Sequence, residues 1–506
     1  MLGSHSGELF PTQCEIPEPF RTAIKTSFME FETIIGLEVH TQLATQTKIF
    51  CRCSTEYGSA PNQNTCPVCL GLPGALPTIN EEAVAFAVML GSATNCSIRR
   101  DSQFARKNYF YPDLPKAYQI SQFDRPICEN GWLEIEIDGV VKRVGITRIH
   151  LEEDAGKLIH DGDDPSSSYV DLNRAGIPLV EIVSEPDLRS AKEAKAYMEK
   201  IHSIVTYLGI CHGNMEKGNL RCDANVSIRP FGQTELGTRT ETKNLNSFKN
   251  IHAAIAYEID RQTDAILNGE RIAQQTRLWD AEKKVSKALR TKEDSDDYRY
   301  FPCPDLPVVK LTDTFINRLK SELPELPDQK IERFLHQYRL SRRDAADLVA
   351  DKATALFFED VVKRGAAAKM AANWITGDMA RLLNESGSTI TECRIAAPHL
   401  QELLDFIVDG TISGKIAKVV FAEMFHTGRS AKSIVEEKGL RQVSDETELL
   451  AICANVVACN GRQVEEFQAG KKKVFGFLVG QVMQQTKGKA NPQMVNNILK
   501  SLLTGD

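Results

Sequence analysis

Four cysteines lie close together in a pattern that could bind a metal ion. Cys51 and Cys53 are separated by one residue. Twelve residues further on, Cys66 and Cys69 are separated by two. Two short knuckles of this kind deliver four thiolates to a tetrahedral zinc ion, and four sulfur ligands leave no position open for water. The spacing therefore predicts a structural zinc site, and the alternative is a loop with four unliganded thiols.

Carboxylate and imidazole groups form a second set of candidates. In one strand-like run, alternation places Glu38 and His40 on the same face. A second strand-like run covers Val144–Glu153, where alternation favours Glu152 as a functional side chain. The turn after this run would also rotate Glu153 inward. A solvated strand face is the alternative for the first pair.

Glu181 lies in an apolar stretch of sequence. Its same-face neighbours in the strand-like run Pro178–Pro186 are Leu179 and Val183. Because burying an unpaired carboxylate is unfavourable by several kcal/mol, Glu181 needs a cation, either a basic side chain or a metal ion. Carboxylate ligands with one imidazole suit magnesium or manganese better than a second zinc. A structural salt bridge is the alternative.

A further strand-like run has one entirely polar face, which includes Arg221, Asp223 and Asn225. This face is a predicted floor for a polar substrate, and a solvent-facing surface is the alternative. Lys107 and Lys116 bracket an aromatic segment and could offer point charges to phosphate. The alternative for both is a solvated lysine.

Several signatures of phosphate and amide chemistry are missing from the sequence. There is no phosphate-binding P-loop and no kinase-like glycine-rich loop, so an ATP site must be of another type. There is also no amidase or nucleophile-elbow pattern and no cysteine in a glutaminase context. The sequence therefore offers no signature for releasing ammonia from glutamine.

The elements that must position these residues fall into three parts. The 506 residues are too many for one hydrophobic core. From Phe31 to about Pro307, short β-like runs between turn residues predict a sheet-rich α+β body. Beyond Pro324, apolar residues recur at helical spacing up to about Phe425 and predict a helical domain. A small helical tail follows, which contains Lys471, Lys472 and Lys473.

The composition of the chain limits the classes of protein to which it can belong. The net charge is -7, so any contact with RNA must be local. The sequence shows no apolar run of membrane-spanning length and no secretory signal. Because the chain has thirteen cysteines and no secretory signal, we expect it to act in a reducing cytoplasm.

Nine segments of the chain, in order, carry a resemblance to a known family. They are Phe31–His40, Arg106–Phe123, Arg148–Lys157, Asp171–Asp187, Leu220–Ser227, Lys243–Phe248, Ser295–Pro302, Gly476–Gly480 and Gly488–Pro492. Together they resemble the B subunit of the glutamyl/aspartyl-tRNA amidotransferases (GatB) over residues 29–506. Nine ordered segments are far more specific than any single motif.

The resemblance implies an organisation as well as an activity. It implies a cradle-shaped catalytic domain with the zinc knuckles at 29–322, a helical domain at 323–432 and a tRNA-binding tail at 433–506. Residues 1–28 have no counterpart in the family and are expected to be a poorly ordered, dispensable extension. The family forms a heterotrimer with an amidase subunit (GatA) and a small subunit (GatC).

The resemblance also implies a reaction. With ATP and Mg²⁺, the GatB chain phosphorylates the side-chain carboxyl of Glu on tRNA(Gln) or Asp on tRNA(Asn), and ammonia released from glutamine by the amidase displaces the phosphate. The family's magnesium ligands carry over to His40, Glu153 and Glu181. Glu38 lies beside them, and Glu152 is kept because alternation favours it.

Two other classes of function are weighed against this one. A noncatalytic tRNA-docking subunit would use the acidic residues only to hold a structural ion. An aminoacyl-tRNA synthetase is disfavoured because the sequence has neither an HIGH nor a KMSKS signature. The choice between Glu-tRNA(Gln) and Asp-tRNA(Asn) stays open.

Overall fold

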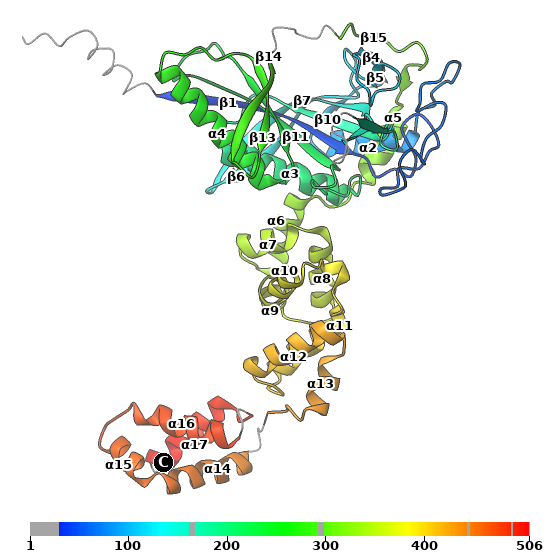
Figure 1. The fold of residues 1–506 in the computed structure, drawn as a ribbon. Coiled ribbons are helices and arrows are strands. Elements are labelled where there is room, and N and C mark those ends of the chain that lie inside the picture. The colour runs from blue at the N-terminus through cyan, green and yellow to red at the C-terminus, as the bar shows by residue number, and fades with distance from the viewer. Residues whose placement is uncertain (1–29, 161–166, 292–297, 443–445, 487–488, 505–506) are drawn as a thin grey trace, which may run out of the picture. The chain divides into compact units, whose positions relative to one another are not determined.

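The computed structural model describes residues 30–160, 167–291, 298–442, 446–486 and 489–504. The predicted extension at 1–28 lies outside these residues. The chain divides into two compact units, one ending at Leu326 and the other beginning at Pro327. Strands dominate the first unit and helices make up the second, which confirms the predicted fold class (Figure 1).

A nine-stranded sheet forms the first unit, in the order β14-β13-β12-β11-β1-β10-β7-β6-β2. Neighbouring strands are antiparallel except β12 and β13. The strands are β1 (Phe31–Gln42), β2 (Ser97–Ile98), β6 (Cys128–Ile137), β7 (Val140–Glu153), β10 (Pro178–Ser184), β11 (Leu220–Pro230), β12 (Thr240–Leu245), β13 (Gln275–Asp280) and β14 (Val285–Thr291). The four strand-like runs that sequence alternation singled out are therefore confirmed as β1, β7, β10 and β11.

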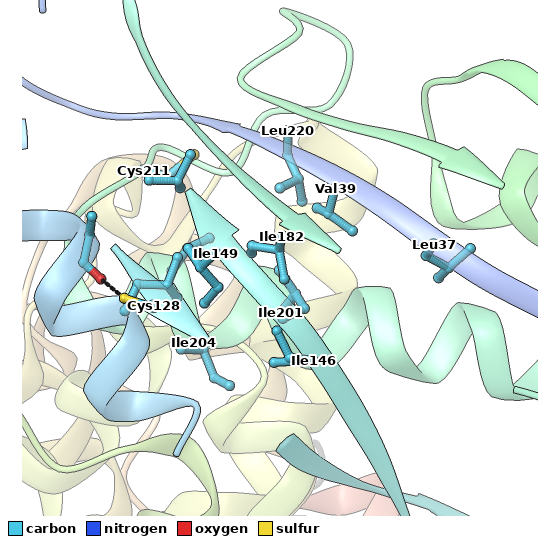
Figure 2. Close-up of a cluster of buried hydrophobic side chains, with 14 of the residues drawn as sticks. Leu37, Val39, Cys128, Ile146, Ile149, Ile182, Ile201, Ile204, Cys211 and Leu220 are labelled. Atoms are coloured by element: carbon cyan, nitrogen blue, oxygen red, sulfur yellow. Dashed lines mark hydrogen bonds between the residues drawn. The ribbon is translucent and has the colours of Figure 1, made fainter. Parts of the chain in front are cut away.

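Helices cover one face of this sheet, and the apolar residues of the strands point toward them. Helix α3 (Ala191–Leu208) and helix α4 (Phe248–Leu267) pack against the strands and against each other (Figure 1). Each begins at a serine whose hydroxyl accepts a hydrogen bond from the first helical turn. Figure 2 shows Val39 of β1 and Ile182 of β10 in one buried cluster with Ile201 of α3. The residues between these apolar positions therefore point to the opposite face.

Two further helices complete this core. They are α2 (Glu81–Ala93), whose Ala87 carbonyl accepts a hydrogen bond from Cys128 Sγ at 3.5 Å (Figure 2), and α5 (Asp313–Ser321). Ile316 and Leu319 of α5 are buried in the same cluster. Because α5 packs into the first unit, this unit extends through Leu326, a few residues beyond the predicted domain end at 322.

Three small sheets stand beside the large one. One contains β15 (Phe301–Pro302), β4 (Ala105–Asn108) and β5 (Tyr118–Ser121). The others pair β3 (Asp101–Ser102) with β16 (Val309–Lys310), and β8 (Lys157–His160) with β9 (Ser168–Asp171). Strand β5 lies against the end of β7, where the Ile120 N–H donates to Glu153 Oε1 at 2.8 Å. The Ser121 hydroxyl of β5 also donates to Glu152 Oε2 at 3.5 Å, so the β4–β5 hairpin reaches residues on both faces at the end of β7.

The second unit is helical throughout its described elements. Its first part contains α6 (Pro327–Tyr338), α7 (Arg342–Val349), α8 (Lys352–Lys363), α9 (Ala368–Trp374), the π-helix η1 (Ile375–Met379), α10 (Ala380–Ser386), the 3₁₀ turn η2 (Ile390–Glu392), α11 (Ala397–Val408), α12 (Gly414–Thr427) and α13 (Ala431–Glu437). The last four helices are α14 (Glu446–Cys459), α15 (Gly461–Gln468), α16 (Val474–Gln485) and α17 (Pro492–Thr504).

The last four helices have a hydrophobic core of their own, which includes Leu478, Val482 and Leu499. The predicted tail boundary at 433 falls inside α13, and the chain enters the first tail helix at Glu446. Among the described residues, none of the helices combines the length and the apolar character needed to cross a bilayer.

Candidate active site

Three neighbouring strands bring the predicted acidic and histidine residues together. His40 of β1 lies directly opposite Glu181 of β10, and Glu181 lies directly opposite His150 of β7. Directly paired residues of antiparallel strands project on the same face. Glu152 projects on this face too, because it lies two residues beyond His150. The cluster thus lies on the face opposite the helices.

The side chains of this cluster approach one another closely. His40 Nε2 lies 3.6 Å from Glu152 Oε1 and 3.6 Å from Glu181 Oε2. His150 Nε2 lies 3.3 Å from Glu181 Oε2 and 3.8 Å from Glu152 Oε2. One ligand atom each from His40, Glu152 and Glu181 lies within 4.8 Å of the other two. Two carboxylate oxygens and one imidazole nitrogen could therefore hold a divalent cation.

Burial makes the charges of this cluster interdependent. Burial opposes ionisation of Glu181, but His150, His40 and Lys107 outweigh it and hold the pKa of Glu181 well below its usual range. Burial also opposes a charge on His150, yet Glu181 and Glu152 raise its pKa to about 9. His150 Nδ1 is buried without a hydrogen-bond partner among the described residues. The carboxylate of Glu181 is thus kept ionised by the positive charges around it.

Glu153 does not belong to this cluster, contrary to the predicted ligand set. Strand β7 continues through Glu153, which pairs with Pro178, so no turn rotates its side chain inward. Both carboxylate oxygens accept hydrogen bonds from Lys116 Nζ, the one to Oε2 at 2.6 Å. Glu153 and Lys116 line a cavity of about 370 Å³ together with Cys69. Lys116 is therefore paired with a carboxylate, and its role as a phosphate ligand stays a prediction.

A second acidic group lies beside the first on the same face of the sheet. Carboxylate oxygens of Glu38, Asp223 and Glu241 lie within 4.8 Å of one another. Lys243 Nζ bridges two of them, at 2.6 Å from Asp223 Oδ2 and 2.9 Å from Glu241 Oε1. Asn225 Nδ2 donates to Glu38 Oε1 at 3.0 Å. Glu38 therefore interacts with the predicted polar floor and is not in the His40 cluster.

Burial and neighbouring carboxylates raise the pKa of Glu38, with Glu181 contributing most among the neighbours. The two acidic groups are therefore electrostatically coupled. Arg221, the remaining predicted residue of the floor, donates to Asp154 Oδ2 at 2.9 Å. Burial opposes the charge on Asp154, but Arg221 and Arg174 lower its pKa. Arg221 thus anchors the turn after β7.

Lys107 faces the first cluster from strand β4. Its ammonium lies 4.8 Å from the ring centre of Tyr298. Burial opposes its charge, but Glu152 raises the pKa of Lys107, with a further contribution from Glu181. The raised pKa favours the charged form of Lys107, and its role as a phosphate ligand stays a prediction.

The four cysteines of the predicted zinc site converge. Their sulfur atoms lie within 4.8 Å of one another, and the Cys66 N–H donates to Cys69 Sγ at 3.1 Å. A hydrogen bond with Cys51 lowers the pKa of the Cys69 thiol to about 4, although burial opposes this. Four convergent sulfurs, one with thiolate character, are the donor set that a tetrahedral metal requires.

The sequence patterns did not identify three residues of the polar face as site residues. They are His150, Glu241 and Lys243. His150 shares the alternation of Glu152, and that was the available signal. Glu241 and Lys243 lie on β12, where a register shift opposite Cys222–Ala224 alters the alternation. The predicted tail residues Lys471, Lys472 and Lys473 lie in the second unit and are exposed.

Two family models match this chain. Residues 33–317 match the family model described as the GatB/GatE catalytic domain. Residues 356–503 match the model described as the GatB domain. The first match contains both acidic groups and the cysteines, so the polar face lies within an enzyme's catalytic domain.

Curated relatives are similar in sequence to this protein over nearly the whole chain. A protein of Desulfotalea psychrophila is 57% identical over 475 residues, which cover 94% of this chain and 100% of the relative. A protein of Geobacter sulfurreducens is 56% identical over 480 residues, with 94% and 100% covered. Each is named as the B subunit of an aspartyl/glutamyl-tRNA(Asn/Gln) amidotransferase. The chain belongs to this family of tRNA-dependent amidotransferase subunits, as the motif resemblance predicted.

Proposed function

We propose that this subunit activates the side-chain carboxyl of a misacylated tRNA with ATP and Mg²⁺, before ammonia converts it to an amide. The observation that supports this is the convergence of His40, Glu152 and Glu181 on the polar face, with Lys107 beside them. The substrates are Glu-tRNA(Gln), Asp-tRNA(Asn) or both. Glutamine is the source of the ammonia.

The donor set fits the proposed cation. His40, Glu152 and Glu181 would hold Mg²⁺, since carboxylate-rich sites suit this hard ion. When bound, the ion supplies positive charge that offsets the charge on the transferring phosphoryl group. His150, 3.3 Å from Glu181, orients that carboxylate from the other side. Lys107 supplies a second positive charge for the phosphates.

The proposed reaction has two steps. An oxygen of the substrate carboxylate attacks the γ-phosphorus of ATP, the bond from this phosphorus to ADP breaks, and an acyl phosphate forms. Ammonia then attacks the acyl carbon, the carbon–oxygen bond breaks, and phosphate leaves with the proton that the nitrogen loses. Activation is needed because a free carboxylate is a poor acyl donor, whereas phosphate is a good leaving group.

The proposal includes partners and a compartment. Because the sequence lacks amidase and glutaminase signatures, ammonia comes from an amidase subunit (GatA), and a small subunit (GatC) completes a heterotrimer. The four clustered cysteines hold a structural Zn²⁺. The twelve cysteines among the described residues are all unpaired, which supports the reducing cytoplasm as the site of action. Helices α14–α17 serve as the tRNA-binding tail.

The test is ATP cleavage by the purified complex, measured with and without each misacylated tRNA, together with detection of the amide product. Glu181→Gln and His40→Ala should each abolish tRNA-dependent ATP cleavage, because each removes a cation ligand without removing core volume. Glu134→Gln on β6 is the matched control, since its side chain is 45% exposed and forms an ion pair with the surface Arg143. This variant should retain the parent activity.

Two outcomes would contradict the proposal. Retained tRNA-dependent cleavage in both site variants would mean that the cluster is not catalytic, and the chain would then be a noncatalytic tRNA-docking subunit. Loss of the folded state in both variants, seen by circular dichroism, would make the cluster a structural ion-pair network.

A further inference from the structure

Four aromatic rings form a continuous series at the edge of the candidate active site. Tyr109 and Tyr298 meet edge to face, with ring centres 5.9 Å apart. Tyr298 meets Tyr300 at 6.0 Å. Tyr300 then stacks on Phe123 with the ring centres 4.1 Å apart and the ring planes inclined by 7°. The series ends in a parallel, face-to-face pair.

The first two rings of this series lie beside Lys107. Lys107 Nζ lies 4.8 Å from the ring centre of Tyr298 and 5.8 Å from that of Tyr109. The same ammonium interacts with Glu152 and Glu181. Tyr300 is close enough for these carboxylates to contribute to its raised pKa, after the effect of burial. Strand β5 connects the aromatic series to the acidic cluster, because the Ser121 hydroxyl donates to Glu152 Oε2 at 3.5 Å and Phe123 follows two residues later. Lys107 lies on the paired strand β4.

The far end of the series is open. Phe123 is 48% exposed, although it is a large apolar side chain. Tyr300 covers one face of its ring, so the exposure lies on the rest of the ring. Phe123 is not part of the hydrophobic core of the unit. A flat ring backed by a second ring and left open is a surface on which another planar group can stack.

We propose that the Phe123–Tyr300 pair stacks an adenine ring, with the phosphate attached to that adenosine directed toward Lys107 and the His40 cluster. The inference rests on the proposed function, which supplies the nucleotide. Stacking requires only a π-face, the ammonium suits the phosphate, and the carboxylates lie beyond the ammonium. The two substrates that carry an adenosine are ATP and the tRNA, whose 3′ end is an adenosine.

The test uses Phe123→Leu in the intact complex, because leucine keeps an apolar side chain and removes the ring. Phe231→Leu is the control, since this phenylalanine is 73% exposed and lies after β11, apart from the aromatic series. Binding of ATP, inorganic tripolyphosphate, intact tRNA and tRNA lacking its terminal adenosine is measured for the parent and both variants. Loss of one stacked base should weaken binding about tenfold.

The two sources of adenine give different results. If ATP stacks there, Phe123→Leu weakens ATP binding about tenfold and leaves tripolyphosphate binding unchanged. If the terminal adenosine stacks there, the variant weakens binding of intact tRNA and not of the shortened tRNA. Equal binding of all four probes by Phe123→Leu and parent would overturn the inference. In that case tRNA-dependent ATP cleavage by the parent would still uphold the proposed function, whereas its absence from the parent would refute that function separately.

Discussion

Glu152 and Glu153 are adjacent in the sequence but lie in opposite environments. Glu152 faces two histidines across the polar face, at 3.6 and 3.8 Å. Glu153 faces Lys116 and the main-chain N–H of Ile120. Because successive strand residues point to opposite faces, only one of the two can serve the His40 cluster. The same substitution at both positions would therefore separate the proposed metal ligand from an ion-pair partner.

We expect Glu152→Gln to weaken Mn²⁺ binding at least about tenfold, because an amide oxygen replaces a charged ligand. Glu153→Gln should leave Mn²⁺ affinity within about twofold. It should instead lower the free energy of unfolding by about 3 kcal/mol, since it breaks a buried ion pair. Titration calorimetry with Mn²⁺ and chemical denaturation measure the two quantities. The reverse assignment of the two effects would restore Glu153 as the ligand.

A buried lysine lies beside the cysteine cluster. Lys48 is fully buried. Its ammonium donates to Cys69 Sγ at 3.6 Å, to the Asn64 carbonyl at 2.7 Å and to the Leu172 carbonyl at 3.2 Å. A cation at this position offsets the excess negative charge of four thiolates around one Zn²⁺ and orients one of them.

Lys48→Met should therefore speed the loss of zinc to a chromogenic chelator by about tenfold, because it keeps the side-chain length and removes the donor. Arg52→Met is the control, since Arg52 lies in the same knuckle and is exposed. Equal rates of zinc release from both variants and the parent would show that Lys48 has only a packing role.

The elements that carry the site were predictable, and their pairing was not. Alternation alone placed Glu38 and His40 on one face of β1, and Arg221, Asp223 and Asn225 on one face of β11. Alternation within one strand cannot show which other strand lies beside it, or in which register. The insertion of β10 between β1 and β7, which creates the His40 cluster, is therefore visible only in the structure.

Local irregularities also limited the prediction. In β12 the register shifts opposite Cys222–Ala224, and Asn244 has a positive φ of 69°. A bulge re-aims the side chains next to it. Lys243 is thus directed onto Asp223, which strict alternation from one strand cannot foresee. The cysteine spacing, in contrast, needed no knowledge of neighbouring strands, because four ligands of one ion must converge.

We expect the four clustered cysteines to bind one zinc ion per chain. The double variant Cys51→Ser/Cys69→Ser should lose this zinc and the fold of the loop from Cys51 to Cys69, while the large sheet is retained. The reason is that the loop contributes few residues to the hydrophobic core, so metal binding supplies much of its folding free energy. Metal analysis measures the zinc, and limited proteolysis should cut the variant within this loop. Cleanly purified parent protein without zinc would contradict the prediction.

Charge is distributed unevenly over the whole molecule. The chain has a net charge of -7, yet its last 56 residues, 451–506, hold seven Lys and Arg against three Asp and Glu, a net charge of +4. Lys471, Lys472 and Lys473 are exposed and immediately precede α16. Cations at a helix N-terminus oppose the helix dipole, so this position does not stabilise the helix. Within the described part of the chain, Lys471 is the one member of the trio with an ion pair, at 3.5 Å from Glu466.

We therefore expect these three lysines to bind the phosphates of the tRNA body rather than the reacting carboxyl. Replacing all three with alanine should weaken tRNA binding by the intact complex and reduce the slope of log affinity against log salt by about 2 to 3, because each phosphate contact releases roughly one counterion. Replacing Lys283, Lys284 and Lys287, which are exposed around the β13–β14 turn, makes the same change in charge and is the control. Glutamine hydrolysis without tRNA should hardly change in either variant, since the lysines act on docking. A Lys471–Lys473 variant that binds tRNA like the parent at every salt concentration would show that this cluster is a solvated surface.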